Sequence, residues 1–201
     1  ELTHELDQMS ATVEELAGRD GERVDLAITL TYNFDEVVAA VAEVKREAHL
    51  DDTKIVLITD AAGLDKTTVR RGLEIMDTNN GEVWGKLDAG TEEYYQLVNR
   101  TSVKFQRVLD NLCDTAKTRP IMIQSLFLKV HGEPMSTQEL EAYCGRLNVI
   151  VTAGGKISEV QAYTVARPTP EAFATKLTKA ELEAMAEIIR KQTDLTVSTY
   201  D

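Results

Sequence analysis

GEVWGKLDAG, residues 81–90, is an apolar strand pattern that ends in a lysine and an aspartate before Ala89-Gly90 turns the chain. Charged side chains at the end of a buried strand are costly without partners. Lys86 and Asp88 lie two residues apart, so in an extended chain both point to the same face. In proteins built from alternating strands and helices, ligands bind at the carboxyl ends of the strands. The stretch therefore predicts a strand and, at its end, a site rather than a solvated surface.

Strand and helix patterns alternate on both sides of this stretch. Apolar runs predict strands at residues 24–31, 54–59, 82–87, 120–128, 157–165 and 195–200. Apolar stripes with helical spacing predict helices at residues 2–16, 34–48, 65–78, 92–99, 104–117, 136–152 and 178–192. Strand–helix units about 30–40 residues apart predict a parallel α/β fold, for which a doubly wound sheet and a β/α barrel are both open. No repeat or linker divides the chain, so we expect one domain, residues 1–201.

Three of these helices begin with capping signals. Asn33 stands where it could cap the helix at residues 34–48. Ser136 precedes Glu139 by three residues, and Thr178 precedes Glu181 by the same spacing. A hydroxyl residue followed three positions later by a glutamate predicts a capping box, in which each side chain bonds the backbone N–H of the other residue.

Composition limits the functions that are open to the chain. Its 201 residues are 43% hydrophobic, enough for one sizeable core, and no apolar run approaches the length of a membrane span. The formal net charge of -12 repels a phosphate backbone, and no run of Lys or Arg offers a basic patch. Cys113 and Cys144, the two cysteines, are far apart and indicate a reducing, cytoplasmic compartment. The three histidines share no metal-binding spacing.

Polar side chains stand at or near the carboxyl ends of four predicted strands. The set is Asp60, Lys86, Asp88, Gln124, Ser125, Gln161, Tyr163, Thr164 and Arg167. Because these ends meet at one edge of a parallel sheet, the set predicts a shared cavity. Two interpretations stay open for Gln124 and Gln161, since an amide in an apolar strand can bond a neighbouring strand or water as well as a ligand. Arg167 suits a carboxylate or phosphate ligand, or a surface ion pair.

Other residues that could carry chemistry are interpreted as structural. His131 follows a strand and is interpreted as a loop residue rather than a base. Tyr94 and Tyr95 begin a helix and are interpreted as packing residues rather than ligands. Gly154-Gly155 ends a helix before a strand, so it is not a nucleotide-binding fingerprint. The sequence has neither a phosphate-binding glycine loop nor a Gly-x-Ser-x-Gly elbow.

Four ordered segments resemble a known superfamily. They are KIVLITDAAGL (54–64), GEVWGKLDAGTEEYYQLVNR (81–100), IMIQSLFLKVHGE (121–133) and VQAYTVARPTPE (160–171). These segments are similar to the middle and C-terminal parts of radical S-adenosylmethionine proteins, and within them to bacterial and archaeal relatives of the wyosine tRNA-base synthases. The resemblance covers residues 24–200 and implies a partial, open parallel β/α barrel of the radical SAM type.

The resemblance also implies cofactors and partners. In the superfamily a Cys-x-x-x-Cys-x-x-Cys loop holds a [4Fe-4S] cluster that chelates S-adenosylmethionine, whose reductive cleavage gives a 5′-deoxyadenosyl radical. The implied cofactor-binding residues are Lys86, Asp88, Gln124, Ser125, Gln161, Thr164 and Arg167. By resemblance, Lys86 and Asp88 contact the ribose or methionine part of the cofactor. Gln124 and Ser125 line the cavity floor. Gln161, Thr164 and Arg167 lie near the adenine or the substrate. The implied partners are a reductant such as ferredoxin or flavodoxin and a small-molecule, peptide or tRNA-base substrate, with no membrane.

The chain departs from the superfamily pattern in two places. It has no three-cysteine motif, and no other residues replace it as cluster ligands. The strand at residues 24–31 runs directly into Tyr32-Asn33-Phe34, where the superfamily has a Gly-Glu-Pro-Thr-like loop that holds the methionine amino group. We expect that an N-terminal cluster-binding segment and a loop near residues 29–32 are missing from this sequence. The other explanation is a degenerate barrel that never binds a cluster.

Three functional hypotheses follow. The leading one is a radical S-adenosylmethionine enzyme core that acts on an unknown substrate, with no metal ligand among these residues. The second is a cofactor-independent lyase, in which Lys86 forms a Schiff base and Asp88 moves protons. The third is a non-catalytic barrel protein that binds a ligand without turnover.

Overall fold

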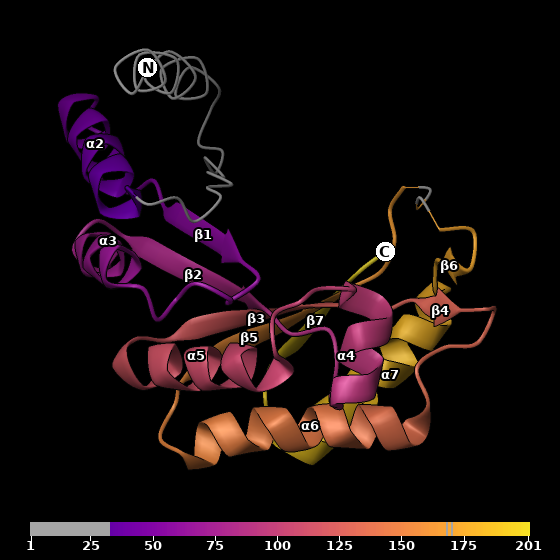
Figure 1. The fold of residues 1–201 in the computed structure, drawn as a ribbon. Coiled ribbons are helices and arrows are strands. Elements are labelled where there is room, and N and C mark those ends of the chain that lie inside the picture. The colour runs from indigo at the N-terminus through magenta and orange to yellow at the C-terminus, as the bar shows by residue number, and fades with distance from the viewer. Residues whose placement is uncertain (1–32, 168, 170) are drawn as a thin grey trace. The chain divides into compact units, whose positions relative to one another are not determined.

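A computed structural model describes residues 33–167, 169 and 171–201 (Figure 1). The helix expected at residues 2–16, the strand expected at residues 24–31 and the place near residues 29–32 where a loop is expected to be missing lie outside these ranges. Over the described ranges, no helix is long and apolar enough to cross a membrane.

The described chain alternates helices and strands around a five-stranded parallel sheet, which confirms the α/β class. The hydrogen-bonding order of this sheet is β1-β2-β3-β5-β7. Its strands are β1 (Ile55–Thr59), β2 (Gly81–Lys86), β3 (Ile121–Leu126), β5 (Ile157–Tyr163) and β7 (Val197–Tyr200). The helices are α2 (Phe34–Glu47), α3 (Thr67–Asp77), α4 (Glu92–Asn99), α5 (Phe105–Thr118), α6 (Thr137–Thr152) and α7 (Lys179–Thr193). Every one of these elements overlaps a predicted range of the same type, with boundaries that differ by a few residues.

The chain divides into two compact units. Among the described residues, the first unit holds 33–59 and Gly63–Trp84, and so includes α2, α3, β1 and most of β2. Helices α2 and α3 pack tightly at Gly72, where a Cβ would lie 2.4 Å from the Phe34 ring. Lys45 is buried near the end of α2 and donates to the Asn79 carbonyl at 2.8 Å, which satisfies its ammonium.

The second unit holds Asp60–Ala62 and Gly85–Asp201, and its parallel strands β3, β5 and β7 have two different faces. Along β3 buried residues alternate with half-buried ones, and Ser125 belongs to the buried set. The buried face meets the helices, since Ser125 Oγ lies 2.7 Å from the Tyr143 hydroxyl of α6. Figure 1 shows α5 and α6 on one side of β3 and β5. The opposite face carries Gln124, paired in register with Gln161 of β5.

A small second sheet follows β3, where the sequence predicted one strand over residues 120–128. Strand β3 ends at Leu126, and β4 (Lys129–Val130) pairs antiparallel with β6 (Ala174–Thr175). The backbone reverses after β4 because His131 and Gly132 have φ of 54° and 86°. His131 lies in this turn with its ring stacked on Phe173, the centroids 5.0 Å apart, which is a structural role for this loop histidine.

The three capping predictions had different outcomes. Thr178 and Glu181 form the complete capping box of α7. At α6 the Ser136 hydroxyl accepts from the Glu139 N–H at 3.2 Å, but the Glu139 carboxylate bonds elsewhere, so the box is only half formed. The prediction for Asn33 is wrong, because its side chain makes no capping hydrogen bond. Its φ of -115° and ψ of 32° lie outside the extended region that a capping side chain requires.

The α7 capping box gives a pH-dependent stability that can be measured. Hydrogen bonds from Lys129 and from the Thr178 backbone and hydroxyl lower the pKa of Glu181 from 4.5 to about 2. A lowered pKa stabilises the fold above pH 4.5, and this stabilisation is lost as the pH falls from 4.5 towards 2. Glu181→Gln is therefore expected to lower the urea midpoint at pH 7 and to lower it less at pH 3. Glu141→Gln, on an exposed position of α6, is the charge-matched control. If Glu181→Gln lowered the urea midpoint by the same amount at pH 3 and at pH 7, this account of the cap would be contradicted.

Candidate functional site

Lys86 and Asp88 lie together at the end of β2, in the second unit. Leu87, between them, donates its N–H to the Gln124 carbonyl at 3.1 Å, which keeps the backbone extended beyond the end of β2. An extended backbone places residues two apart on the same side. The Lys86 Nζ accordingly lies 3.9 Å from Asp88 Oδ2. The structure thus brings Lys86 and Asp88 together, as the alternation of strand residues predicts.

The Asp88 carboxylate is buried and surrounded by donors. Its side chain is 6% exposed, Oδ1 accepts from the Leu126 N–H at 2.8 Å, and Oδ2 accepts from the Asn99 amide at 3.1 Å. Burial raises the pKa of Asp88, while Lys86, the Leu126 N–H and Asn99 oppose this rise. Because Leu126 belongs to β3 and Asn99 to α4, this one carboxylate ties the end of β2 to two other elements.

The Lys86 ammonium lies near both Asp88 and Tyr163. A third of its side chain is exposed, and Nζ lies 5.9 Å from the centroid of the Tyr163 ring, which belongs to β5. Burial alone lowers the pKa of Lys86, but the Asp88 carboxylate and the Tyr163 side chain outweigh burial and raise it above its ordinary value. Lys86 is therefore a cation at neutral pH.

A short loop brings a second carboxylate, that of Asp60, to the cavity that Lys86 and Asp88 line. Asp60 Oδ1 accepts from the Ala62 N–H at 3.0 Å, so the aspartate closes its own turn. The Asn111 amide of α5 donates to the Ala61 carbonyl at 2.7 Å, which anchors the loop to the second unit. Ala61 has a φ of 63°, so the turn needs this external support.

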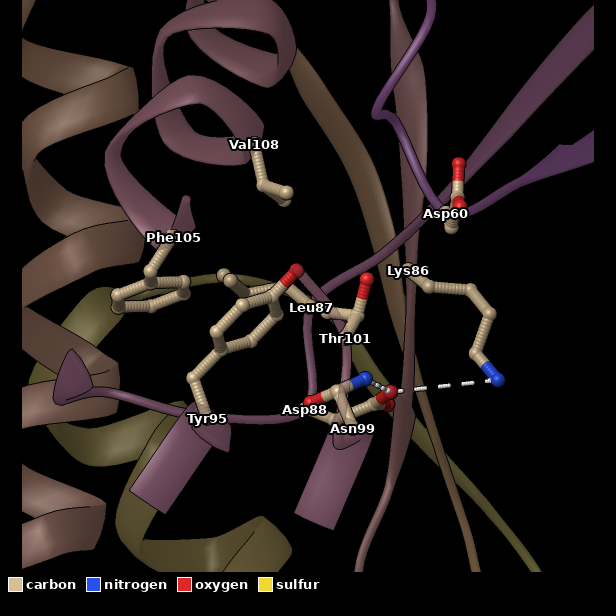
Figure 2. A pocket seen from close by; sticks show the side chains of 9 residues that line it. All are labelled: Asp60, Lys86, Leu87, Asp88, Tyr95, Asn99, Thr101, Phe105 and Val108. Atoms are coloured by element: carbon tan, nitrogen blue, oxygen red, sulfur yellow. Dashed lines mark hydrogen bonds and ion pairs between the residues drawn. The ribbon is translucent and has the colours of Figure 1, made fainter. Parts of the chain in front are cut away.

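These side chains line a cavity of about 140 Å³, drawn in Figure 2. Its lining residues are Asp60, Lys86, Leu87, Asp88, Tyr95, Asn99, Thr101, Phe105 and Val108. The Tyr95 and Phe105 rings stack with centroids 4.9 Å apart and form an aromatic wall. Two carboxylates and one ammonium give the cavity a net negative charge, which favours a ligand that carries positive charge and hydroxyl donors. The cavity is small compared with typical ligand pockets, which measure about 300–1,000 Å³, so it would hold only part of a larger ligand.

Gln124 and Gln161 form a pair on the face of β3 and β5 opposite the helices. The Gln124 amide donates to Gln161 Oε1 at 3.4 Å, and Gln161 Nε2 lies 4.0 Å from the Met122 sulfur. The neighbouring strand therefore supplies the hydrogen-bond partner of the Gln124 amide, which is the interpretation that requires no ligand. Neither residue lines the cavity described above.

The other three sequence-derived candidates lie elsewhere. Ser125 is buried on the helix side, where its hydroxyl donates to the Leu87 carbonyl at 2.6 Å and meets Tyr143. Thr164 is also buried, and its Oγ1 accepts from the Leu177 N–H at 3.0 Å, just before α7. Arg167 is exposed. The structure therefore brings Lys86 and Asp88 to one cavity and leaves Ser125, Thr164 and Arg167 outside its lining.

The turn after Asp88 is held by a residue that sequence reasoning assigned to a cap. Glu139 Oε1 accepts from the Gly90 and Thr91 N–H groups at 2.6 and 3.0 Å, and Oε2 accepts from the Thr91 hydroxyl at 2.6 Å. Arg146 donates to the Gly90 carbonyl at 2.8 Å. Thr91 then caps α4 by accepting from the Tyr94 N–H. Glu139 thus fixes where β2 ends and α4 begins, which positions both Asp88 and Asn99.

Sequence reasoning also missed the aromatic and amide residues around the pair. Tyr95 was read as a packing residue, and it both packs on Phe105 and lines the cavity. Asn99 was read only as the end of a helix. The available signal was the helical spacing of Tyr95 and Asn99, four residues apart, which places both on the face of α4 that meets Asp88.

The residues present do not fit an iron–sulfur cluster. No group of three or more His, Cys, Asp or Glu side chains that could hold a metal occurs in the described part of the chain. Cys113 lies in α5, and Cys144 is buried in α6, where burial raises its pKa to about 11. A thiol with a raised pKa is a poor ligand, because metals bind the thiolate.

Comparisons with known proteins identify the fold. Neither a known protein family nor a curated protein matches the sequence. The structure is similar to a domain of pyruvate-formate lyase-activating enzyme from Bacteroides vulgatus, with a TM-score of 0.62 and 9% identity over 90% of this chain and 100% of that chain. It is also similar to a radical SAM methyltransferase from Sphaerobacter thermophilus, with a TM-score of 0.54 and 11% identity over 82% of this chain and 46% of that chain. At these identities the likeness establishes the fold alone, a partial, open parallel β/α barrel of the radical SAM type.

Proposed function

We propose that this chain is the S-adenosylmethionine-binding barrel of a radical SAM enzyme. The observation that carries the proposal is the Lys86–Asp88 pair, which lines a cavity at the carboxyl end of a parallel strand. Ligands of open α/β sheets bind at such strand ends. The fold shared with radical SAM enzymes supports the choice of ligand.

The charges of the cavity suit this ligand. S-adenosylmethionine carries a sulfonium, an ammonium, two ribose hydroxyls and one carboxylate. The exposed Asp60 carboxylate can accept from a hydroxyl or ammonium, while the Lys86 ammonium suits the methionine carboxylate. The Tyr95–Phe105 wall offers an aromatic surface to a cation. The cavity would take the ribose or methionine part, with the rest of the cofactor outside it.

The part of the reaction that these residues carry is binding and orientation. Asp88 holds the end of β2, Lys86 and Asp60 contact the ligand, and the aromatic wall excludes water from it. A [4Fe-4S] cluster would need thiolates that these residues do not supply, so no step of the reaction is assigned here to the cluster. The resemblance to wyosine synthase relatives supports a nucleobase substrate, whereas the net charge of -12 favours a small molecule or peptide over a large RNA.

The environment of Lys86 opposes the Schiff-base alternative. A nucleophilic lysine needs a lowered pKa, obtained by desolvation or a neighbouring cation. Lys86 is desolvated, but Asp88 and Tyr163 outweigh that effect and keep it protonated. We therefore expect no adduct after borohydride treatment with carbonyl compounds such as pyruvate, and a stable adduct at Lys86 would favour the lyase.

A calorimetric titration with S-adenosylmethionine tests the proposal. The wild-type chain is expected to bind with a saturable isotherm. Lys86→Met is expected to weaken binding by about 10-fold, the value of one hydrogen bond to a charged group. Lys117→Met, which removes an exposed lysine of α5, is the matched control. No saturable binding, or equal affinity in wild type and Lys86→Met, would contradict the proposal.

Turnover separates the enzyme from the non-catalytic alternative. A barrel that binds without reacting would show the same titration, and the protein encoded by the complete gene would form no 5′-deoxyadenosine after anaerobic reconstitution with iron, sulfide and dithionite. Because these 201 residues lack the cysteine motif, an iron assay on the same sample says whether a cluster is present at all.

A further inference from the structure

Tyr163 completes the surroundings of Lys86. It is the last residue of β5, opposite Leu126 of β3 and Tyr200 of β7 in register. Lys86 belongs to β2, on the other side of β3, yet its ammonium reaches within 5.9 Å of the Tyr163 ring centroid and interacts with the Tyr163 hydroxyl. The lysine therefore extends across the end of β3.

Asp88 alone does not fix this ammonium. The Nζ–Oδ2 distance of 3.9 Å exceeds that of a hydrogen bond, and the Asp88 oxygens already accept from Leu126 and Asn99. A lysine side chain is flexible, and a third of this one is exposed, so it could turn to solvent. Tyr163 is a second restraint, because its ring centroid lies 5.9 Å from Lys86 Nζ.

We propose that Tyr163 is a positioning residue of the ligand site, which holds the Lys86 ammonium beside Asp88 at the open end of the strands. The hydroxyl supplies a hydrogen-bond partner, and the centroid of the electron-rich ring lies 5.9 Å from the cation. A cation that is already held in place loses less freedom when a ligand binds, so Tyr163 strengthens ligand binding through Lys86. The identity of the ligand as S-adenosylmethionine rests on the proposed function, while the positioning of Lys86 does not.

Three variants test this role. Tyr163→Phe removes the hydroxyl and keeps the ring, and Tyr163→Leu removes both. Tyr200→Phe is the matched control, because Tyr200 is the neighbour of Tyr163 in register and is half exposed. Circular dichroism establishes that each variant is folded.

The first measurement is made without ligand. Side-chain NMR of lysine-labelled protein reports the pKa of Lys86 and the ring-current shift of its methylene protons. We expect the pKa of Lys86 to fall in both Tyr163 variants, the ring-current shift to vanish only in Tyr163→Leu, and neither to change in Tyr200→Phe. An unchanged Lys86 pKa and an unchanged ring-current shift in folded Tyr163→Leu would overturn the proposal.

The second measurement is the affinity for S-adenosylmethionine. Tyr163→Phe is expected to weaken binding several-fold, by up to about 10-fold, and Tyr163→Leu to weaken it further. Equal affinity in wild type and both variants would overturn the link to ligand binding. If the wild-type chain binds no S-adenosylmethionine, the proposed function fails, and the ligand-free NMR result still decides whether Tyr163 positions Lys86.

Discussion

Gly90→Ala is expected to destabilise the fold by about 3 kcal/mol or more, the upper range for overpacking a tight contact. A Cβ at Gly90 would lie 2.1 Å from the Tyr143 backbone N and 2.7 Å from the Glu139 carbonyl oxygen. Both atoms belong to the backbone of α6, which cannot rotate away as a side chain could. The turn would have to leave α6, and the Glu139 hydrogen bonds to Gly90 and Thr91 would be lost with it.

Urea unfolding followed by circular dichroism measures this effect through the free energy of unfolding. Gly145→Ala is the matched control, because Gly145 is exposed within α6 and a Cβ there meets nothing within 4 Å. Helix propensity predicts that this control is stabilised by up to about 1 kcal/mol. Equal free energies for the two alanine variants would show that the turn does not need its contact with α6.

Asp88→Ala is expected to cost about 2–3 kcal/mol of stability and to abolish measurable ligand binding. The substitution removes the acceptor of the buried Leu126 N–H and the Asn99 amide, and it removes the partner of Lys86. The cost is smaller than for a fully buried pair, because the partly exposed Lys86 ammonium can turn to water. Asp88→Asn keeps the shape but sets an amide donor against other donors, so it is expected to lose binding as well.

Urea unfolding and S-adenosylmethionine titration on the same samples separate the two effects. Asp114→Ala removes a carboxylate that is 65% exposed and paired with Lys117, and is expected to change stability by less than about 0.5 kcal/mol. If Asp88→Ala were as stable as this control, Asp88 could not be the residue that ties β2 to β3 and α4.

The fold could be predicted from the sequence because the patterns that determine its strands and helices are local. The alternation of short apolar runs with amphipathic stripes predicted the type of every main-sheet strand and helix in the described ranges. Thr178 and Glu181 form their box because both partners lie within one turn of α7. Glu139 carries the same signature, yet its carboxylate binds Gly90 and Thr91, which are 49 and 48 residues away. Nothing in the sequence near Glu139 distinguishes these two outcomes.

The site could be predicted only in part, because only some of its contacts are set by neighbouring residues in the sequence. Lys86 and Asp88 share a face because strand residues alternate, and the same alternation separates Gln124 from Ser125. Ser125 faces Tyr143 of α6, so the two neighbours cannot line one wall. Asn99, Asp60 and Tyr163 come to the pair from three different segments. Their positions depend on which strands are neighbours in the sheet. The alternation of strands and helices left both a doubly wound sheet and a barrel open, and only the resemblance favoured the barrel.

The most direct test of the account is to locate ligand binding by NMR. Titration of the ¹⁵N-labelled chain with S-adenosylmethionine is predicted to give saturable amide shifts for residues 86–90, Asn99, Thr101 and Leu126, with no such shifts along α3. The same shifts should be absent in Asp88→Asn. Saturable shifts that leave residues 86–90 and Leu126 unmoved, or no saturable shifts at all, would contradict the assignment of the Lys86–Asp88 cavity as the ligand site.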